Sequence, residues 1–223
     1  MPRGTLIINF KNYAEILGNK SLELAKSAET VARRVDVEMI VAPPVPLLHA
    51  VSRKVSIPVF SQKVDDRDQG KSTGAIVAQA IRESGCSGSI LNHSESRVPP
   101  STIRKILARM RTLRLSTCLC AETARETSEF AKFSAEYLAV EPPELIGTGL
   151  AVSRAMPEMV SKTVSEVRRR GYRGKILCGA GIVSGEDVVA ARRHGMRGVL
   201  VSSSVVMARN WKDKIRELAE PLE

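Results

Sequence analysis

The chain has 223 residues, of which 43% are hydrophobic, 4% aromatic and 26% charged, and its formal net charge is +10. That length allows a substantial core, and no Gly/Ser/Pro-rich linker divides the chain, so we expect one globular domain over residues 1–223. No apolar run approaches the length of a membrane span, and the N-terminus lacks the layout of a signal peptide. We therefore expect a cytoplasmic protein with no membrane partner.

The basic residues are spread along the sequence over many predicted helices, with the densest stretch at 97–114. Because aromatic residues are scarce, platforms for stacking bases are few, and the composition argues against a nucleic-acid partner. A positive field also attracts a small anionic substrate. The four cysteines fit a reducing compartment, and Cys118 and Cys120 are expected to share one face of a strand as buried thiols.

Short apolar runs alternate with amphipathic helical patterns along the chain. The apolar runs predict strands at 5–10, 37–42, 57–61, 87–91, 115–119, 136–140, 175–178 and 199–202. The helical patterns predict helices at 22–32, 46–53, 75–84, 103–113, 121–133, 157–169, 185–194 and 211–218. Strands that are apolar on both faces, each followed by a helix, indicate a parallel sheet covered by helices. Eight such units in one chain favour closure into a (β/α)₈ barrel.

In such barrels the chemistry gathers at the C-terminal ends of the strands. Polar residues and small turn residues fall at these ends here. They are Asn9 and Lys11 after the first strand, His93 after the fourth, Glu141 after the sixth, Gly181 after the seventh, and Ser202 and Ser203 after the eighth. Taken singly, each has an ordinary explanation, such as a solvated lysine, a structural histidine or a serine that caps a helix. Their joint placement on one rim indicates a site.

The residue types on this rim suit one kind of chemistry. Turns rich in Gly and Ser that open helices offer main-chain N–H groups to a phosphate, and Gly147 can add a third donor. A carboxylate without a metal-ligand cluster suits proton abstraction beside a carbonyl, and a neutral imidazole with an ammonium suits the resulting enediolate. The set predicts aldose–ketose isomerisation of a small phosphorylated metabolite, with no metal or cofactor.

Four motifs carry a resemblance to a known family. Asn9-Phe10-Lys11, Asn92-His93-Ser94-Glu95, the segment from Val140-Glu141-Pro142 to Ile146-Gly147-Thr148-Gly149, and Cys178-Gly179-Ala180-Gly181-Ile182 occur in this order. Together they resemble the triosephosphate isomerases over essentially the whole chain, and the short length resembles the archaeal branch.

The resemblance implies an activity and residue roles. The substrates would be D-glyceraldehyde 3-phosphate and dihydroxyacetone phosphate, in glycolysis and gluconeogenesis. Glu141 would be the base, His93 the neutral electrophile and Lys11 a positive charge, with Asn9 beside it. The resemblance further places Ile146 and Gly147 in a lid, Gly181, Ser202 and Ser203 at the phosphate, and Glu95 near Lys11 and Arg97.

The family also implies a homo-oligomer, either a dimer or a tetramer. The segment 62–74 resembles the loop that family members insert into a neighbouring subunit, with Thr73 reaching toward its active site. In a tetramer, the basic run at 97–114 would face acids such as Glu122, Glu126 and Glu129 of another subunit.

The chain departs from the family pattern in places. Ser202-Ser203-Ser204 stands where archaeal relatives typically have Ala-Ser-Gly, Val183 replaces a usual Ser, and Lys63 replaces a His. These changes bear on affinity and remove no catalytic group. Two other hypotheses remain: a catalytically idle barrel that binds phosphate or RNA, and a different phosphate-binding barrel enzyme.

Overall fold

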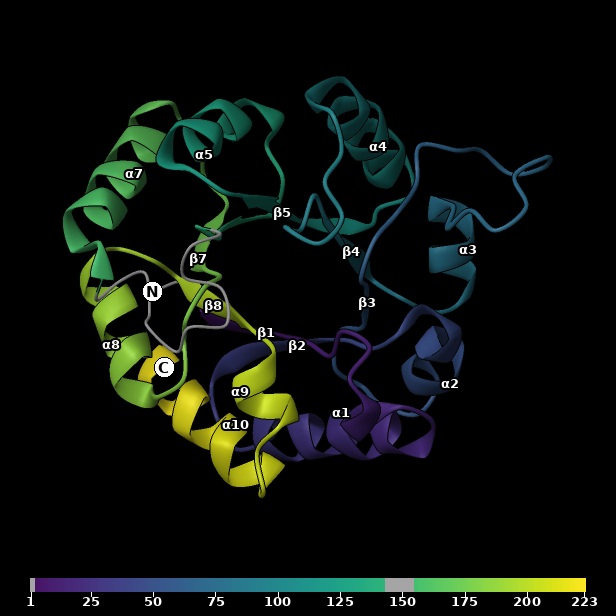
Figure 1. Cartoon of the computed structure of the whole chain (residues 1–223), viewed down its shortest axis with the longest axis horizontal. Helices are drawn as coiled ribbons and strands as arrows, with labels where there is room; N and C mark the ends of the chain where they lie inside the picture. The colour runs from purple at the N-terminus through teal and green to yellow at the C-terminus, as the bar shows by residue number, and fades with distance from the viewer. Residues whose placement is uncertain (1–2, 143–154) are drawn as a thin grey trace.

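The computed structural model describes residues 3–142 and 155–223, and its frame is a parallel sheet curled into a barrel with helices around it (Figure 1). The strands are β1 (Gly4–Asn9), β2 (Val37–Ala42), β3 (Phe60–Ser61), β4 (Gly88–Leu91), β5 (Ser116–Ala121), β6 (Tyr137–Val140), β7 (Lys175–Cys178) and β8 (Gly198–Val201). Their order in the sheet is β2-β1-β8-β7-β6-β5-β4-β3, and a parallel bridge between Val41 and Val59 joins the two ends. The predicted (β/α)₈ barrel is confirmed.

The helices lie outside the strands. They are α1 (Asn19–Ala32), α2 (Leu48–Ser52), α3 (Ala78–Glu83), α4 (Pro100–Thr112), α5 (Ala124–Phe130), α7 (Pro157–Arg169), α8 (Gly185–Arg193), α9 (Ser203–Val206) and α10 (Trp211–Ala219), with 3₁₀ turns η1 (Ala14–Ile16), η2 (Val45–Leu47), η3 (Ala131–Phe133) and η5 (Glu220–Leu222). Within residues 3–142 and 155–223, no helix is both long and apolar enough to cross a bilayer.

Two of the differences from the predicted elements have a clear cause. The third strand is only two residues long rather than the predicted 57–61, because Pro58 has no N–H to donate to a neighbouring strand. Its carbonyl still accepts the Val41 N–H at 3.1 Å. The helix α9 was not predicted, since four residues are too few to show a helical period.

Alternation along the strands separates the core into an inner and an outer layer. Ile7 of β1 belongs to the apolar cluster inside the barrel, whereas its neighbours Leu6 and Ile8 pack under the helices. Cys118 and Cys120 both face inward, as their spacing predicts, and all four cysteines are buried thiols that form no disulfide among the described residues. Side chains therefore fill the barrel and leave the chemistry to its rim.

Polar groups meet at the N-terminal end of the barrel. Lys175 Nζ lies 2.9 Å from Glu38 Oε2 and donates to Thr5 Oγ1 at 2.8 Å, while the Tyr137 hydroxyl donates to Glu38 Oε1 at 2.9 Å. Burial alone would raise the pKa of Glu38, but the bonds from Lys175, Thr5 and Tyr137 prevail and hold that pKa below its usual value. This cluster satisfies its polar groups internally.

The segment between β3 and α3 projects away from the barrel (Figure 1). Arg109 of α4 holds its first part through Asp66 at 3.1 Å and Asp68 at 2.8 Å. Thr73, expected to reach a neighbouring subunit, is exposed at its far part.

Candidate active site

A pocket of about 470 Å³ lies where β1, β4, β6, β7 and β8 end. The structure brings most of the predicted site residues into its wall. They are Asn9, Lys11, His93, Glu141, Gly181, Ser202 and Ser203. Ile146 and Gly147 lie outside the described residues.

Glu141 is held in the pocket wall directly after β6. Its N–H donates to the Ala121 carbonyl at 2.8 Å, and the residue is only 2% exposed. A Cβ atom on residue 179 would lie 2.5 Å from Glu141 Cγ, so the glycine at that position makes room for the side chain. Glu141 Oε2 is buried without a hydrogen-bond partner among the described residues.

Burial controls the charge of Glu141. It raises the pKa of Glu141 to about 7, although the Cys120 thiol and the positive charge of Lys11 oppose that shift. A carboxyl with this pKa can take and return a proton near neutral pH. The neighbouring Cys120 was not predicted as a site residue, because from the sequence it is one more inward-facing strand residue.

His93 follows β4 and is 8% exposed. The preceding Asn92 has a φ of 61° and fastens this turn, since its amide donates to the Cys120 carbonyl at 2.9 Å and its Oδ1 accepts the Val98 N–H at 2.9 Å. The hydrogen bonds of the Asn92 side chain thus stabilise a left-handed main-chain conformation that most other residue types avoid.

The tautomer of His93 follows from a hydrogen bond. The Glu95 N–H donates to His93 Nδ1 at 3.2 Å, and a main-chain N–H can only donate, so Nδ1 carries no proton. Burial, with the charge of Lys11, lowers the pKa of His93 to about 4, against the opposing charge of Glu95. The ring is therefore neutral at pH 7 with its proton on Nε2, which lies 3.6 Å from Glu141 Oε1.

Lys11 is fixed at both its main chain and its side chain. Its φ is 50°, its N–H donates to Asn9 Oδ1 at 3.0 Å, and its carbonyl accepts from Gln62 Nε2 at 2.9 Å. Its ammonium lies 2.7 Å from Glu95 Oε1. Gln62 was not predicted as a site residue, although its position directly after a strand is the same signal that indicated the other rim residues.

The expected surroundings of Glu95 are confirmed for Lys11. Arg97, however, forms ion pairs with Glu122, at 3.4 Å, and with Glu126. Glu129 pairs with Arg125 at 3.2 Å. The acids suggested as partners for the basic run of another subunit are thus engaged within this chain.

The turns after β7 and β8 form the remaining wall of the pocket. Gly181 has a φ of 72°, a conformation that glycine adopts without strain. The Ser202 side chain makes no capping bond to α9, and the hydroxyl oxygens of Ser202 and Ser204 are buried without a partner among the described residues. No Arg or Lys occurs at 179–183 or 202–204, so the donors these turns offer to an anion are main-chain N–H groups and serine hydroxyls.

A second cavity of about 770 Å³ adjoins the pocket and shares Asn9, Lys11, Tyr13, His93 and Glu95 with it. It extends toward the projecting segment, where Gln62 and Ile76 line it. The rim of the barrel is therefore open on the side of that segment.

Comparison with known proteins places this geometry in a family. The family model described as triosephosphate isomerase matches residues 4–218. The chain belongs to the triosephosphate isomerase family. This family is a family of isomerases.

Curated triosephosphate isomerases from archaea match nearly the full chain. The protein from Methanocaldococcus jannaschii is 44% identical, over 96% of this chain and 97% of its own length. Those from Caldivirga maquilingensis and Methanothermus fervidus are 42% and 40% identical, over 97% and 98% of this chain and 96% and 98% of their own lengths. The archaeal type of the family, expected from the motifs, is confirmed.

Proposed function

We propose that the protein interconverts D-glyceraldehyde 3-phosphate and dihydroxyacetone phosphate by proton transfer through an enediolate. Membership of the triosephosphate isomerase family supports the substrate. The observation that carries the mechanism is the 3.6 Å approach of the protonated Nε2 of neutral His93 to Glu141, in the wall of a pocket that also has main-chain donors for a phosphate.

Glu141 is the base in this proposal. Its carboxylate removes a proton from the carbon beside the substrate carbonyl, and the carboxylic acid so formed returns that proton to the adjacent carbon. A pKa raised to about 7 serves both halves of the cycle, because neither the ionised nor the protonated form is strongly disfavoured. Among residues 3–142 and 155–223, no donor occupies Oε2, which leaves this carboxylate oxygen available to the substrate.

His93 and Lys11 stabilise the oxygen atoms of the intermediate. The Nε2–H of His93 donates to the oxygen on which negative charge develops, and the Lys11 ammonium adds a fixed positive charge beside Asn9. Glu95 supports both groups, since it pairs with Lys11 and its N–H fixes the His93 tautomer.

The phosphate is bound by the turns after β7 and β8, through main-chain N–H groups of Gly181, Ser202 and Ser203. Small side chains and the glycine conformation at 181 allow close approach of an anion to the main chain. The roles of Ile146 and Gly147 in closing the site rest on the family resemblance. The proposal involves no metal or cofactor.

We further propose that the protein is a cytoplasmic homo-oligomer, a dimer or tetramer, that acts in glycolysis and gluconeogenesis. The exposed segment that carries Thr73 and the cavity open on that side support subunit association. Light scattering at micromolar concentration tests it, and a fully active monomer would contradict it.

A coupled assay of purified protein in both directions tests the function. Turnover of glyceraldehyde 3-phosphate that is abolished in Glu141→Gln and retained in Glu122→Gln supports the proposal. A pure preparation that binds inorganic phosphate but turns over neither triose phosphate would instead indicate an idle barrel.

A further inference from the structure

The barrel topology gathers basic residues that are dispersed in the sequence. Every helix that returns to the sheet ends near the N-terminal ends of the strands, so the turns after these helices meet at one end of the molecule. Six of these turns each present an exposed basic side chain, and we call this set the basic end. Its members are Arg34, Lys54, Arg114, Lys132, Arg173 and Arg193.

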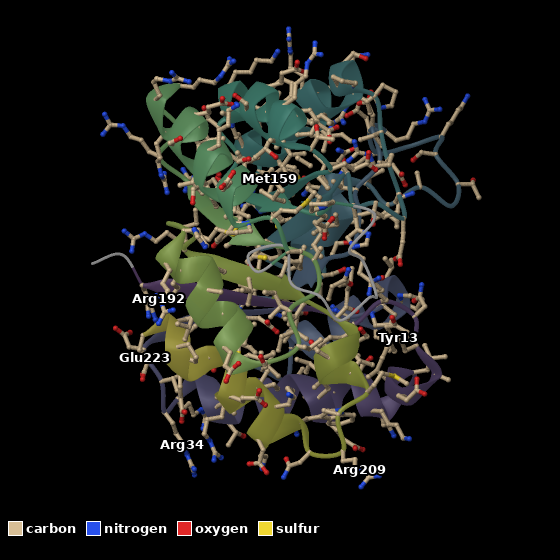
Figure 2. All side chains as sticks on the ribbon, turned by 60° about the vertical axis from the view of Figure 1, so that its left-hand side comes forward. Tyr13, Arg34, Met159, Arg192, Arg209 and Glu223 are labelled. Atoms are coloured by element: carbon tan, nitrogen blue, oxygen red, sulfur yellow. The ribbon has the colours of Figure 1, made fainter. Side chains whose placement is uncertain are left out.

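The basic end lies away from the active-site pocket. In Figure 2, Arg34 and Arg192 lie at one edge of the molecule, while Tyr13, which lines the pocket, lies toward the opposite edge. A ligand on the basic end would therefore leave the pocket accessible to a triose phosphate.

Lys132 lies over an aromatic ring, with its Nζ 5.4 Å from the centre of the Phe133 ring. Other arginines at this end have an evident structural function that the remaining five members of the basic end lack. Their guanidinium groups donate to main-chain carbonyls of the turns and so complement helix C-termini and turns. They are Arg82 on Leu113, Arg111 on Phe133, Arg168 on Tyr172 and Gly174, and Arg192 on Pro221 and Glu223. Within residues 3–142 and 155–223, no hydrogen bond or ion pair occupies the charged groups of Arg34, Lys54, Arg114, Arg173 and Arg193.

Carboxylates in these turns offset only part of this charge. Asp36 pairs with Arg3 at 3.0 Å, Glu223 accepts the Asp36 N–H at 2.9 Å, and Glu136 accepts the Thr117 N–H at 2.8 Å. A carboxylate bonded to a main-chain N–H keeps its negative charge, and an arginine bonded to a main-chain carbonyl keeps its positive charge. The six members of the basic end and the four arginines above therefore outnumber these three carboxylates.

The chemistry of the basic end favours a polymer of phosphodiesters. Four of its members are arginines, whose planar donor fork matches a phosphate. The exposed large hydrophobic side chains of the described residues lie elsewhere, and Phe133, Tyr137 and Tyr172 near this end are buried. The face therefore offers nothing to insert into a bilayer or to stack on a base. Charges spread around a whole face suit the evenly charged backbone of a duplex.

We propose that the basic end binds the phosphate backbone of double-stranded nucleic acid, without sequence readout. The scarcity of aromatic residues, which argued against a nucleic-acid partner, excludes base stacking and leaves backbone contacts open. The dispersal of these basic residues along the sequence does not argue against a nucleic-acid site, because the fold brings the six turns together at one end. Binding of this kind depends steeply on salt, because each neutralised phosphate releases a counterion.

Fluorescence anisotropy with a labelled duplex of mixed sequence tests this between about 50 and 200 mM salt. The test variant combines Arg114→Gln, Arg173→Gln and Arg193→Gln. The control combines Lys20→Gln, Arg209→Gln and Lys212→Gln, which removes the same charge from exposed residues of the opposite end. Isomerase turnover should stay at the wild-type level in both and shows that both are folded. Lys54→Gln with Lys132→Gln and Arg173→Gln replaces the first variant if its turnover falls.

The wild type should bind the duplex with a linear dependence of log affinity on log salt. The basic-end variant should lose at least about tenfold in affinity at low salt, and its slope should fall by up to about 2.7, at about 0.9 per contact, while the control changes little. Equal losses in the two variants would show that net charge alone acts, and no binding by the wild type at low salt would also overturn the proposal. Tighter binding to anionic vesicles or to polyglutamate than to the duplex would show that the partner class is wrong.

Discussion

His93 Nε2 lies 3.6 Å from Glu141 Oε1, and the two side chains are only 9% and 3% exposed to solvent. Burial disfavours the charged form of both groups, so it shifts their pKa values in opposite directions. It raises the pKa of the Glu141 carboxyl to about 7 and lowers the pKa of the His93 imidazole to about 4, so a neutral imidazole lies beside a carboxyl that titrates near neutrality. The pKa of Glu141 is thus above that of His93, the reverse of the usual order for Glu and His, and the proposed chemistry requires this order.

Glu141→Gln should retain the fold and lower kcat by at least about two orders of magnitude, the scale of general-base removal. The amide keeps the shape of the side chain but cannot accept the proton. Steady-state kinetics with glyceraldehyde 3-phosphate measure the effect, with Glu122→Gln as the control. Turnover near the wild-type value would contradict the proposed role.

The same substitution should stabilise the protein above neutral pH. The folded pKa of Glu141 is above its usual value, so folding is favoured by protonation and the stability contribution falls as pH rises from about 4.5 to about 7. Removing the charge should raise the free energy of unfolding by on the order of 3 kcal/mol at pH 8, at about 1.4 kcal/mol per unit of pKa shift. Denaturant unfolding at pH 5 and pH 8 measures it, and an equal change at both pH values would contradict this assignment of the pKa.

The pH dependence of kcat/KM should show an acidic limb near pH 7. Below that pH the Glu141 carboxylate becomes protonated in the free enzyme and activity should fall about tenfold per unit. His93 adds no limb above pH 5, since its pKa is about 4 and the ring stays neutral. A limb near 4.5, the ordinary glutamate value, would show that the carboxylate is not desolvated in the working enzyme.

Gly179→Ala should lower kcat while leaving the barrel folded. The added Cβ would lie 2.5 Å from Glu141 Cγ, so the carboxylate must shift, and a shift of about 1 Å can cost about 10²-fold in rate. Kinetics and circular dichroism together measure it. Combining the change with Glu141→Ala, which removes the Cγ atom, should relieve the crowding, so Gly179→Ala should lower the free energy of unfolding less there than in the wild type, as denaturant unfolding measures.

Gln62→Leu should lower kcat/KM by about tenfold or more. It removes the donor to the carbonyls of Lys11 and Ala42, and a carbonyl left without a partner costs about 1–3 kcal/mol. The Lys11 main chain, which has a φ of 50°, would then relax, and the Lys11 ammonium would move away from the pocket. Gln79→Leu, which removes a comparable surface bond to Glu83, is the control and should leave kinetics unchanged.

Ser202→Ala should keep KM within a few-fold, whereas Gly181→Val should raise it strongly. The Ser202 hydroxyl makes no hydrogen bond among the described residues, and its main-chain N–H survives the change. A valine at φ 72° is strained, and its side chain would enter the space proposed for the phosphate. The reverse order of effects would show that the hydroxyl, and not the main chain, binds the phosphate.

The sequence predicted the eight strand–helix units because each strand is short, apolar and followed by a helical period. It predicted the rim residues because the barrel rule assigns chemistry to strand ends. The limits were set by contacts between distant segments: Gln62 meets Lys11 across 51 positions, and Asn92 meets Cys120 across 28. The pairing of Arg97 with Glu122 and Glu126, instead of a partner subunit for those acids, likewise depends on how the loop before α4 lies against the start of α5.

The joint between β2 and β3 has a consequence for how the barrel opens. Neighbouring strands elsewhere share ladders of two to six residue pairs, but here Val41 and Val59 form a single bridge and Pro58 cannot donate. Few hydrogen bonds must break to separate β2 from β3, so the main-chain amides between these two strands should exchange with solvent before those of β1 and β8. The segment 62–74, expected to enter a neighbouring subunit, begins directly after β3, so subunit association would protect the strand pair of the barrel that has the fewest hydrogen bonds.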